Sequence, residues 1–114
     1  MASTSPEQDP ATYFGFSDLH GFKDFVVYVL SCAPDLFPED DWRAPDQQMN
    51  LERAFLGLRY GLDLTVQEKG ESVLLNQCRQ LMDEALIEYH AGRDHSGQNK
   101  LEQMEGLLKK LPSR

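Results

Sequence analysis

Residues 33–46 read APDLFPEDDWRAPD, and this stretch separates two parts of the chain whose apolar residues recur at helical spacing. It contains three of the six prolines and the only tryptophan of the 114-residue chain, together with five carboxylates and one arginine. Proline has no backbone N–H and disfavours helical backbone in the residue before it. We therefore expect an irregular acidic loop here, in which Pro38 begins one short helical turn.

The segment before the loop, residues 13–33, is predicted to form the first long helix. Its apolar positions recur every three or four residues: Leu19, Phe22, Val26, Val29 and Ala33. Ser17 is the expected N-cap, with Asp18 in the first turn, and Pro34 ends the helix. A strand is the alternative for residues 26–29, VVYV, because β-branched residues are common in strands.

The segment after the loop, residues 46–69, is predicted to form the second helix, with Pro45 at its start. One face of this helix is apolar: Leu51, Phe55, Leu58, Leu62 and Val66. Gly57 and Gly61 are four residues apart and therefore share one side of the helix. Since each glycine costs up to ~1 kcal/mol of helix propensity, we expect a second helix to cross closely at this point.

Two more helices are predicted over residues 71–91 and 94–111, with Gly70 and Gly92 as breaks and Asp94 as the last N-cap. The short connection between them makes an antiparallel hairpin. Five positions partly resemble a tetratricopeptide repeat: Leu81, Ala85, Gly92, Gly97 and Leu101. An ordinary helical hairpin is the better interpretation, because repeat arrays need several stacked copies. The predicted fold is all-α, a compact antiparallel bundle of four helices.

The length of the chain suits a single domain, which we place at residues 13–114. Residues 1–12 are small, polar and interrupted by prolines, so we expect a flexible tail, with packing against the domain as the alternative. Cys32 and Cys78 lie on different predicted helices and are expected to be free thiols. The amino terminus does not resemble a signal peptide and no apolar run is long enough for a membrane span, which favours a cytoplasmic protein.

The formal net charge is −8, and it is distributed unevenly. Residues 1–63 hold 11 acids and 4 bases, a net of −7, whereas residues 64–114 hold 8 acids and 7 bases, a net of −1. Binding to nucleic acid or to an anionic membrane needs clustered Lys and Arg, so we expect neither. The acidic first half suits a protein partner with a basic surface, or it serves only solubility.

We expect no catalytic site, metal or cofactor. The chain contains no Gly-x-Ser-x-Gly, no phosphate-binding glycine loop and no His-Glu-x-x-His. His90, Asp94 and His95 straddle a predicted helix end and do not complete a set of four ligands. Acid–base catalysis also needs a desolvated carboxyl group, whereas Glu39 and Asp40 lie in a loop that we expect to be exposed.

The loop is the candidate partner-binding site. Its carboxylates surround the aromatic residues and Leu36, and the proposed site residues are Asp35, Phe37, Glu39, Asp40, Asp41, Trp42 and Asp46. An aromatic anchor ringed by charge is the composition of a protein-binding hot spot, with acids that steer a basic partner. The alternative is that Phe37 and Trp42 pin the loop to the core while the acids are only solvated.

In size, acidity and lack of catalytic residues, the chain resembles the small all-helical immunity proteins of bacterial toxin systems. The resemblance is one of overall character without a shared motif, so no residue role is transferred. It implies a stoichiometric inhibitor whose acidic loop occludes the basic cleft of a cytosol-acting nuclease or ADP-ribosyltransferase. Separately, the four helical stripes lead us to expect a helical monomer or small oligomer. The alternatives are an adaptor that binds a peptide in the groove between the last two helices, and a helical enzyme subunit.

Overall fold

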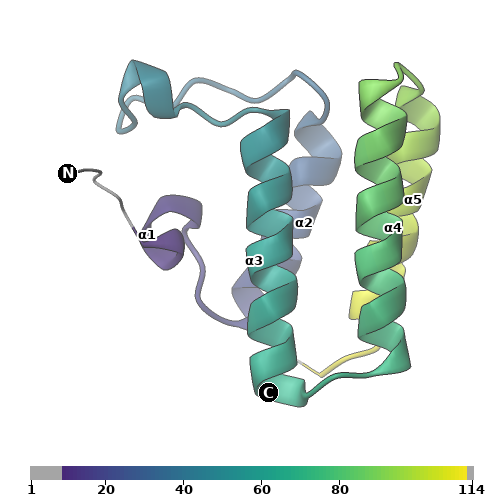
Figure 1. The fold of residues 1–114 in the computed structure, drawn as a ribbon. Coiled ribbons are helices and arrows are strands. Elements are labelled where there is room, and N and C mark those ends of the chain that lie inside the picture. Colours follow the sequence, from purple (N-terminus) through teal and green to yellow (C-terminus); the bar gives the residue numbers. More distant parts are fainter. Residues whose placement is uncertain (1–8, 113–114) are drawn as a thin grey trace.

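The computed structural model describes residues 9–112, which form five α-helices and one 3-10 helix (Figure 1). The elements in chain order are α1 (Pro10–Phe14), α2 (Leu19–Cys32), η1 (Pro45–Gln47), α3 (Leu51–Lys69), α4 (Val73–His90) and α5 (Asp94–Leu108). Residues 9–112 contain no strand, so the prediction of an all-α protein is confirmed and the strand alternative for residues 26–29 is wrong.

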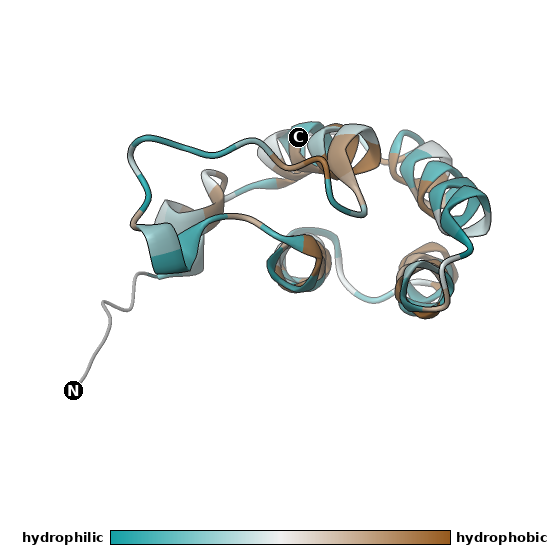
Figure 2. Cartoon of the chain, turned by 90° about the horizontal axis from the view of Figure 1, so that it is seen from above, coloured by the Kyte–Doolittle hydropathy of each residue, from teal (hydrophilic) through white to brown (hydrophobic). Residues whose placement is uncertain are grey.

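The four long helices, α2 to α5, alternate in direction and form a four-sided bundle (Figures 1 and 2). Helix α2 packs against α3 and α5, and α4 packs against the same two helices. Residues 70–72 and 91–93 are the only residues between α3, α4 and α5, and such short connections place successive helices side by side and antiparallel. The predicted hairpin of the last two helices is thereby confirmed.

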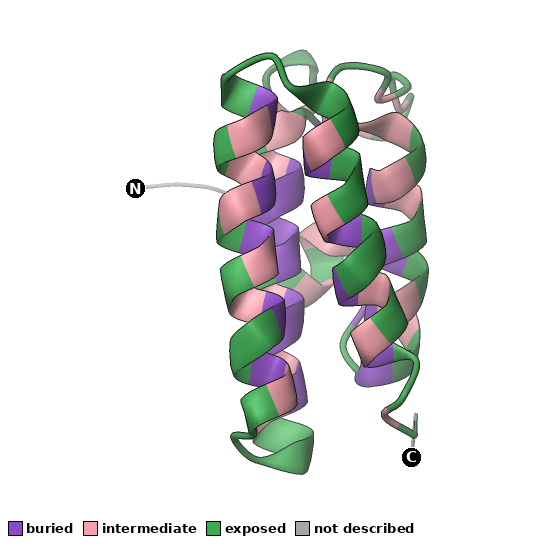
Figure 3. Cartoon of the chain, turned by 90° about the vertical axis from the view of Figure 1, so that its right-hand side faces the viewer, coloured by how far each residue is buried: buried purple, intermediate pink, exposed green. Residues whose placement is uncertain are grey.

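The core lies between the four long helices. Figure 3 shows that the buried positions run as stripes along the helix faces that turn toward the neighbouring helices. The largest fully buried apolar side chains come from all four helices: Leu19, Phe22, Leu58, Leu62, Leu75, Met82, Leu101, Met104 and Leu108. Burial of each such side chain stabilises the fold by roughly 1.5–3 kcal/mol relative to an exposed position. The apolar periodicity of the sequence therefore accounts for the bundle.

Helix starts differ from the predictions because the capping side chains are other than expected. Asp18, not Ser17, is the N-cap of α2, and its carboxylate accepts a hydrogen bond from the Gly21 N–H at 2.9 Å. Asp94 is the first residue of α5 and not its cap, which is Arg93 without a side-chain hydrogen bond. Asp and Ser both accept from the free N–H groups of a first turn, so neighbouring candidates are hard to distinguish by sequence.

Two predicted helices are shorter than expected at their amino ends. The segment 13–33 is split by Gly15, whose φ of +85° ends α1, and α2 begins four residues later at Leu19. Helix α3 begins at Leu51 rather than near residue 46, because Asn50 caps it and Pro45–Gln47 form a separate 3-10 turn. The turn expected from Pro38 is not helical.

The tail predicted for residues 1–12 overlaps the described structure only at its end. Residues 1–8 lie outside the described residues. Asp9 caps α1 by accepting from the Thr12 N–H at 2.9 Å, and α1 packs against α3. Residues 9–12 of the predicted tail therefore belong to the described structure.

The close helix crossing predicted from Gly57 and Gly61 is confirmed. A Cβ atom on Gly61 would lie 2.0 Å from the ring of Phe22, and one on Gly57 would lie 2.6 Å from the ring of Phe25. Both phenylalanines are in α2, so α2 and α3 approach along this glycine face. The two glycines make room for aromatic rings that larger residues would displace.

Candidate protein-binding site

The connection between α2 and α3, residues 33–50, is here called the acidic loop, and Arg43 holds it to the rest of the domain. The Arg43 side chain is only 6% exposed. Its Nε donates to the Asp40 carboxylate at 2.9 Å, and its Nη2 donates to the Tyr13 carbonyl oxygen at 2.9 Å. Its guanidinium carbon lies 4.1 Å from the ring centroids of both Tyr13 and Trp42. Arg43 is therefore a stacked and ion-paired link between the loop and α1.

Gln48 holds the loop backbone through both ends of its amide. Its Oε1 accepts from the Asp40 N–H at 2.7 Å. Its Nε2 donates to the carbonyl oxygens of Asp40 at 3.0 Å and Arg43 at 2.9 Å. A side-chain amide thus satisfies backbone groups that no regular secondary structure pairs.

Two further residues bind the carbonyl groups near η1. Arg53, in the first turn of α3, donates to the carbonyl oxygens of Gln48 at 2.8 Å and Asp46 at 2.7 Å. The Tyr13 hydroxyl donates to the Gln47 carbonyl oxygen at 2.8 Å. The loop therefore has a defined conformation although most of it lacks regular secondary structure. These linking residues carry no signal in the sequence, because no local pattern marks a side chain that bonds a distant backbone.

The structure separates the two aromatic residues predicted for the site. Phe37 is half-buried and packs edge-on against Tyr28, with ring centroids 5.8 Å apart. Trp42 is 69% exposed and is covered on one side by Arg43. Phe37 therefore pins the loop to the core, as the alternative interpretation predicted, whereas Trp42 does not.

The carboxylates predicted for the site also divide into two kinds. Asp40 is partly buried in its ion pair with Arg43. The other four are exposed and pair with no base among the described residues: Asp35, Glu39, Asp41 and Asp46. Leu36, between them in sequence, is 71% exposed. The loop thus presents unpaired negative charge and two large apolar side chains to solvent.

A pocket of about 310 Å³ lies where the acidic loop meets α2 and the chain between α1 and α2. Five aromatic rings line it: Phe14, Phe16, Phe25, Tyr28 and Trp42. Asp24, Asp40 and Arg43 also line it, and we call it the Trp42 pocket. Burial is the main cause that raises the pKa of the Tyr28 phenol, so this wall of the pocket is uncharged at neutral pH.

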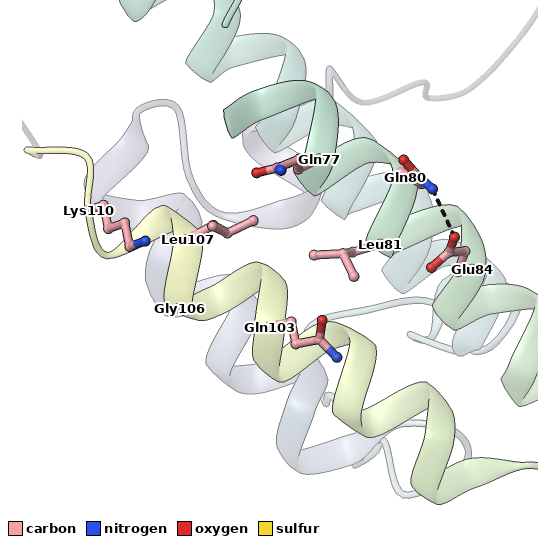
Figure 4. Close-up of a pocket in the computed structure, with 8 residues that line it drawn as sticks. All are labelled: Gln77, Gln80, Leu81, Glu84, Gln103, Gly106, Leu107 and Lys110. Atoms are coloured by element: carbon pink, nitrogen blue, oxygen red, sulfur yellow. Dashed lines mark hydrogen bonds between the residues drawn. The ribbon is translucent and has the colours of Figure 1, made fainter. Parts of the chain in front are cut away.

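A larger hollow of about 600 Å³, the α4–α5 groove, runs between the outer faces of α4 and α5 (Figure 4). Leu81 and Leu107 point toward each other between the two helices, and glutamines of both helices lie around them: Gln77, Gln80 and Gln103. A Cβ atom at Gly106 would meet nothing within 4 Å, so this side of the groove is open. A peptide-binding adaptor, the alternative function, would use this groove between the last two helices.

The described residues do not bring together three His, Cys, Asp or Glu side chains in a way that holds a metal ion. His90 instead pairs with Glu52 of α3, with its Nε2 2.8 Å from the carboxylate oxygen. Cys32 and Cys78 are free, as predicted, and burial raises the pKa of the Cys78 thiol to about 11. None of the helices in residues 9–112 has the length and apolar character needed to cross a membrane.

Comparisons with protein-family models, with curated proteins and with solved structures found no match to this chain. No residue role is therefore transferred from a relative. The candidate sites are those that the surface itself provides, namely the acidic loop with its Trp42 pocket and the α4–α5 groove.

Proposed function

We propose that this chain is a stoichiometric protein inhibitor that binds a partner with a basic surface through the acidic loop. The observation that carries the proposal is Trp42, which is 69% exposed on a loop held in place by part-buried hydrogen bonds. In the more specific form, it is an immunity-type protein that covers the basic cleft of a cytosol-acting toxin domain, such as a nuclease or an ADP-ribosyltransferase, and excludes the substrate.

The contacts of Arg43 and Gln48 favour this proposal because they order the loop before any partner binds. A loop that is already ordered loses less conformational entropy on association, and a larger share of the contact energy then appears as affinity. Tryptophan is among the residues that contribute most at protein interfaces. Trp42 stacks on Arg43 at 4.1 Å, so its ring has a fixed support and an outer side open to a partner.

The exposed carboxylates supply the long-range part of the interaction. Glu39 and Asp41 flank Asp40 and carry charge that no base among the described residues neutralises. Exposed charges at an interface mainly raise the association rate of an oppositely charged partner, and added salt weakens this effect. A basic active cleft, which must handle RNA or a nucleotide, is such a partner.

The proposal is tested with the product of the gene directly upstream, where an immunity gene's toxin is expected. Association and dissociation rates are measured at several salt concentrations for the native chain and for a Glu39→Lys/Asp41→Lys variant. The matched control is Asp83→Lys/Glu102→Lys, which changes the same charge at exposed positions of α4 and α5.

We expect the loop variant to associate about tenfold more slowly at low salt, an effect that shrinks as salt rises, while the control changes the rate much less. Inhibition of the toxin activity should fall in parallel. Equal slowing by both variants would mean that net charge alone acts, and would refute the assignment of the loop.

The α4–α5 groove favours a second candidate, an adaptor that binds an extended peptide. Its glutamine amides can donate and accept hydrogen bonds along a peptide backbone, while Leu81 and Leu107 offer an apolar floor. Gly106→Leu discriminates between the candidates, because the new side chain would enter the open side of the groove without meeting the core. Binding through the acidic loop should be unchanged in this variant, whereas peptide binding in the groove should be lost.

A further inference from the structure

The Trp42 pocket differs from the other surface hollows in its chemistry. It combines five aromatic rings with the carboxylates of Asp24 and Asp40 in a volume of about 310 Å³. This volume is near the lower limit of small-molecule sites, and it suits one long side chain better than a cofactor. We propose that the pocket receives the side chain of one arginine or lysine of the partner. This inference rests on the proposed function, because it names the group that a basic partner would insert beside the loop.

The aromatic lining favours a cation. A guanidinium or ammonium group is attracted to the face of an aromatic ring, most strongly to tryptophan, and its alkyl stem packs well on apolar surface. The same ring already stacks on a guanidinium within the chain, since the Arg43 guanidinium carbon lies 4.1 Å from the Trp42 ring centroid. Trp42 is 69% exposed and lines the pocket, so part of the ring remains available for a second group.

The charges around the pocket also favour a cation, although Arg43 is one of the lining residues. Asp40 compensates the charge of Arg43 at 2.9 Å, and the Arg43 side chain is only 6% exposed. Asp24, on α2, is exposed and pairs with no base among the described residues. Asp24 is therefore the one carboxylate of the pocket lining without an ion pair within residues 9–112.

The buried Arg43 also decides whether the pocket could bind an anionic ligand. Its Nη1 has no hydrogen-bond partner among the described residues, yet this atom is buried and does not reach the pocket surface. An anionic ligand would therefore find the carboxylates of Asp24 and Asp40 in the pocket lining, while the unpaired Nη1 of Arg43 is buried. The arrangement selects against anions and in favour of a basic side chain.

The test uses two small probes of nearly equal shape, which need no identified partner. N-acetylargininamide carries one guanidinium, and N-acetylcitrullinamide replaces it with an uncharged urea. Each is titrated into the ¹⁵N-labelled chain while the Trp42 indole N–H and the Gly15 and Gly21 amides, which border the pocket, are followed by NMR. The variants are Asp24→Asn and, as the control away from the pocket, Asp83→Asn, an exposed carboxylate on α4 that pairs with Arg59 at 3.6 Å.

We expect N-acetylargininamide to shift the three pocket signals saturably and the citrulline probe to bind more weakly. Asp24→Asn should weaken the arginine probe about two- to fivefold, the size of an exposed ion pair, and Asp83→Asn should leave it unchanged. Absence of a saturable shift, or equal binding of both probes, would overturn the inference. If the pocket fails this test while Glu39→Lys/Asp41→Lys still slows partner association, the proposed function stands and only the inserted side chain is refuted.

Discussion

The tight packing of the Phe22 ring of α2 on Gly61 of α3 makes Gly61→Ala the sharpest test of the fold. The added Cβ would lie 2.0 and 2.2 Å from two ring carbons of Phe22, whereas carbon atoms pack favourably at about 3.5–4.0 Å. The ring must therefore move by about 1.5 Å, or the helices must separate by a similar distance. Phe22 is fully buried and stacks on Phe16, with ring centroids 5.7 Å apart, so it has no free space to enter.

Two opposing effects decide the magnitude. Alanine gains up to ~1 kcal/mol of helix propensity over glycine within a helix such as α3. Overpacking of a well-packed core typically costs about 1–3 kcal/mol, and the short distance at Gly61 places the cost at the upper end. We expect Gly61→Ala to lower the free energy of unfolding by about 2 kcal/mol. In a domain of this size, each kcal/mol of lost stability lowers Tm by roughly 4–8 °C.

Gly106→Ala is the matched control. Gly106 is exposed in the last turn of α5, and a Cβ there would meet nothing within 4 Å. This variant should stabilise the protein by up to ~1 kcal/mol through helix propensity alone. Chemical denaturation of both variants, followed by circular dichroism, measures the contrast in sign. A Gly61→Ala protein as stable as Gly106→Ala would refute the close packing of α2 on α3.

Trp42→Ala should change the free energy of unfolding by less than about 1 kcal/mol, because the ring is 69% exposed. The same variant should dissociate from the partner faster, by an amount worth ~2 kcal/mol or more. A large fall in Tm would show that Trp42 supports the fold instead. A thiol reagent should label Cys32 before Cys78, whose pKa burial raises to about 11, and equal labelling rates in the native protein would contradict the buried position. The hydrogen bonds of Arg93 at 2.7 and 2.8 Å lower the pKa of Glu88 to about 2. The ionised Glu88 therefore stabilises the fold above the ordinary pKa of 4.5, and this stabilisation is lost as the pH falls through 2. Glu88→Gln should therefore be less stable than the native chain at neutral pH and equally stable near pH 2, and a constant difference across that range would refute the pairing.

The periodicity of the sequence was enough to predict the all-α class, the four long helices and the hairpin of α4 and α5. Apolar residues at helical spacing have one stable arrangement, with their stripes turned inward, so local information predicts the bundle. Gly57 and Gly61 carried tertiary information as well, because a glycine pair within a helix needs a compensating contact. Gly70 and Gly92, with φ of +84° and +80°, ended α3 and α4 at the predicted breaks.

The acidic loop shows what the sequence could not determine. Phe37 and Trp42 are both aromatic residues among acids, yet Phe37 packs on Tyr28 and Trp42 faces solvent. The path of the loop was beyond local reasoning, since its backbone bonds to Gln48 and to Tyr13, which is 34 residues from its acceptor. The start of α3, by contrast, has a local signal, because the Asn50 side chain caps the helix by accepting from the Arg53 N–H at 2.9 Å. Helices depend on contacts three or four residues apart, which the sequence displays. A loop is held by side chains that reach backbone groups far along the chain, and only the folded arrangement brings those groups together.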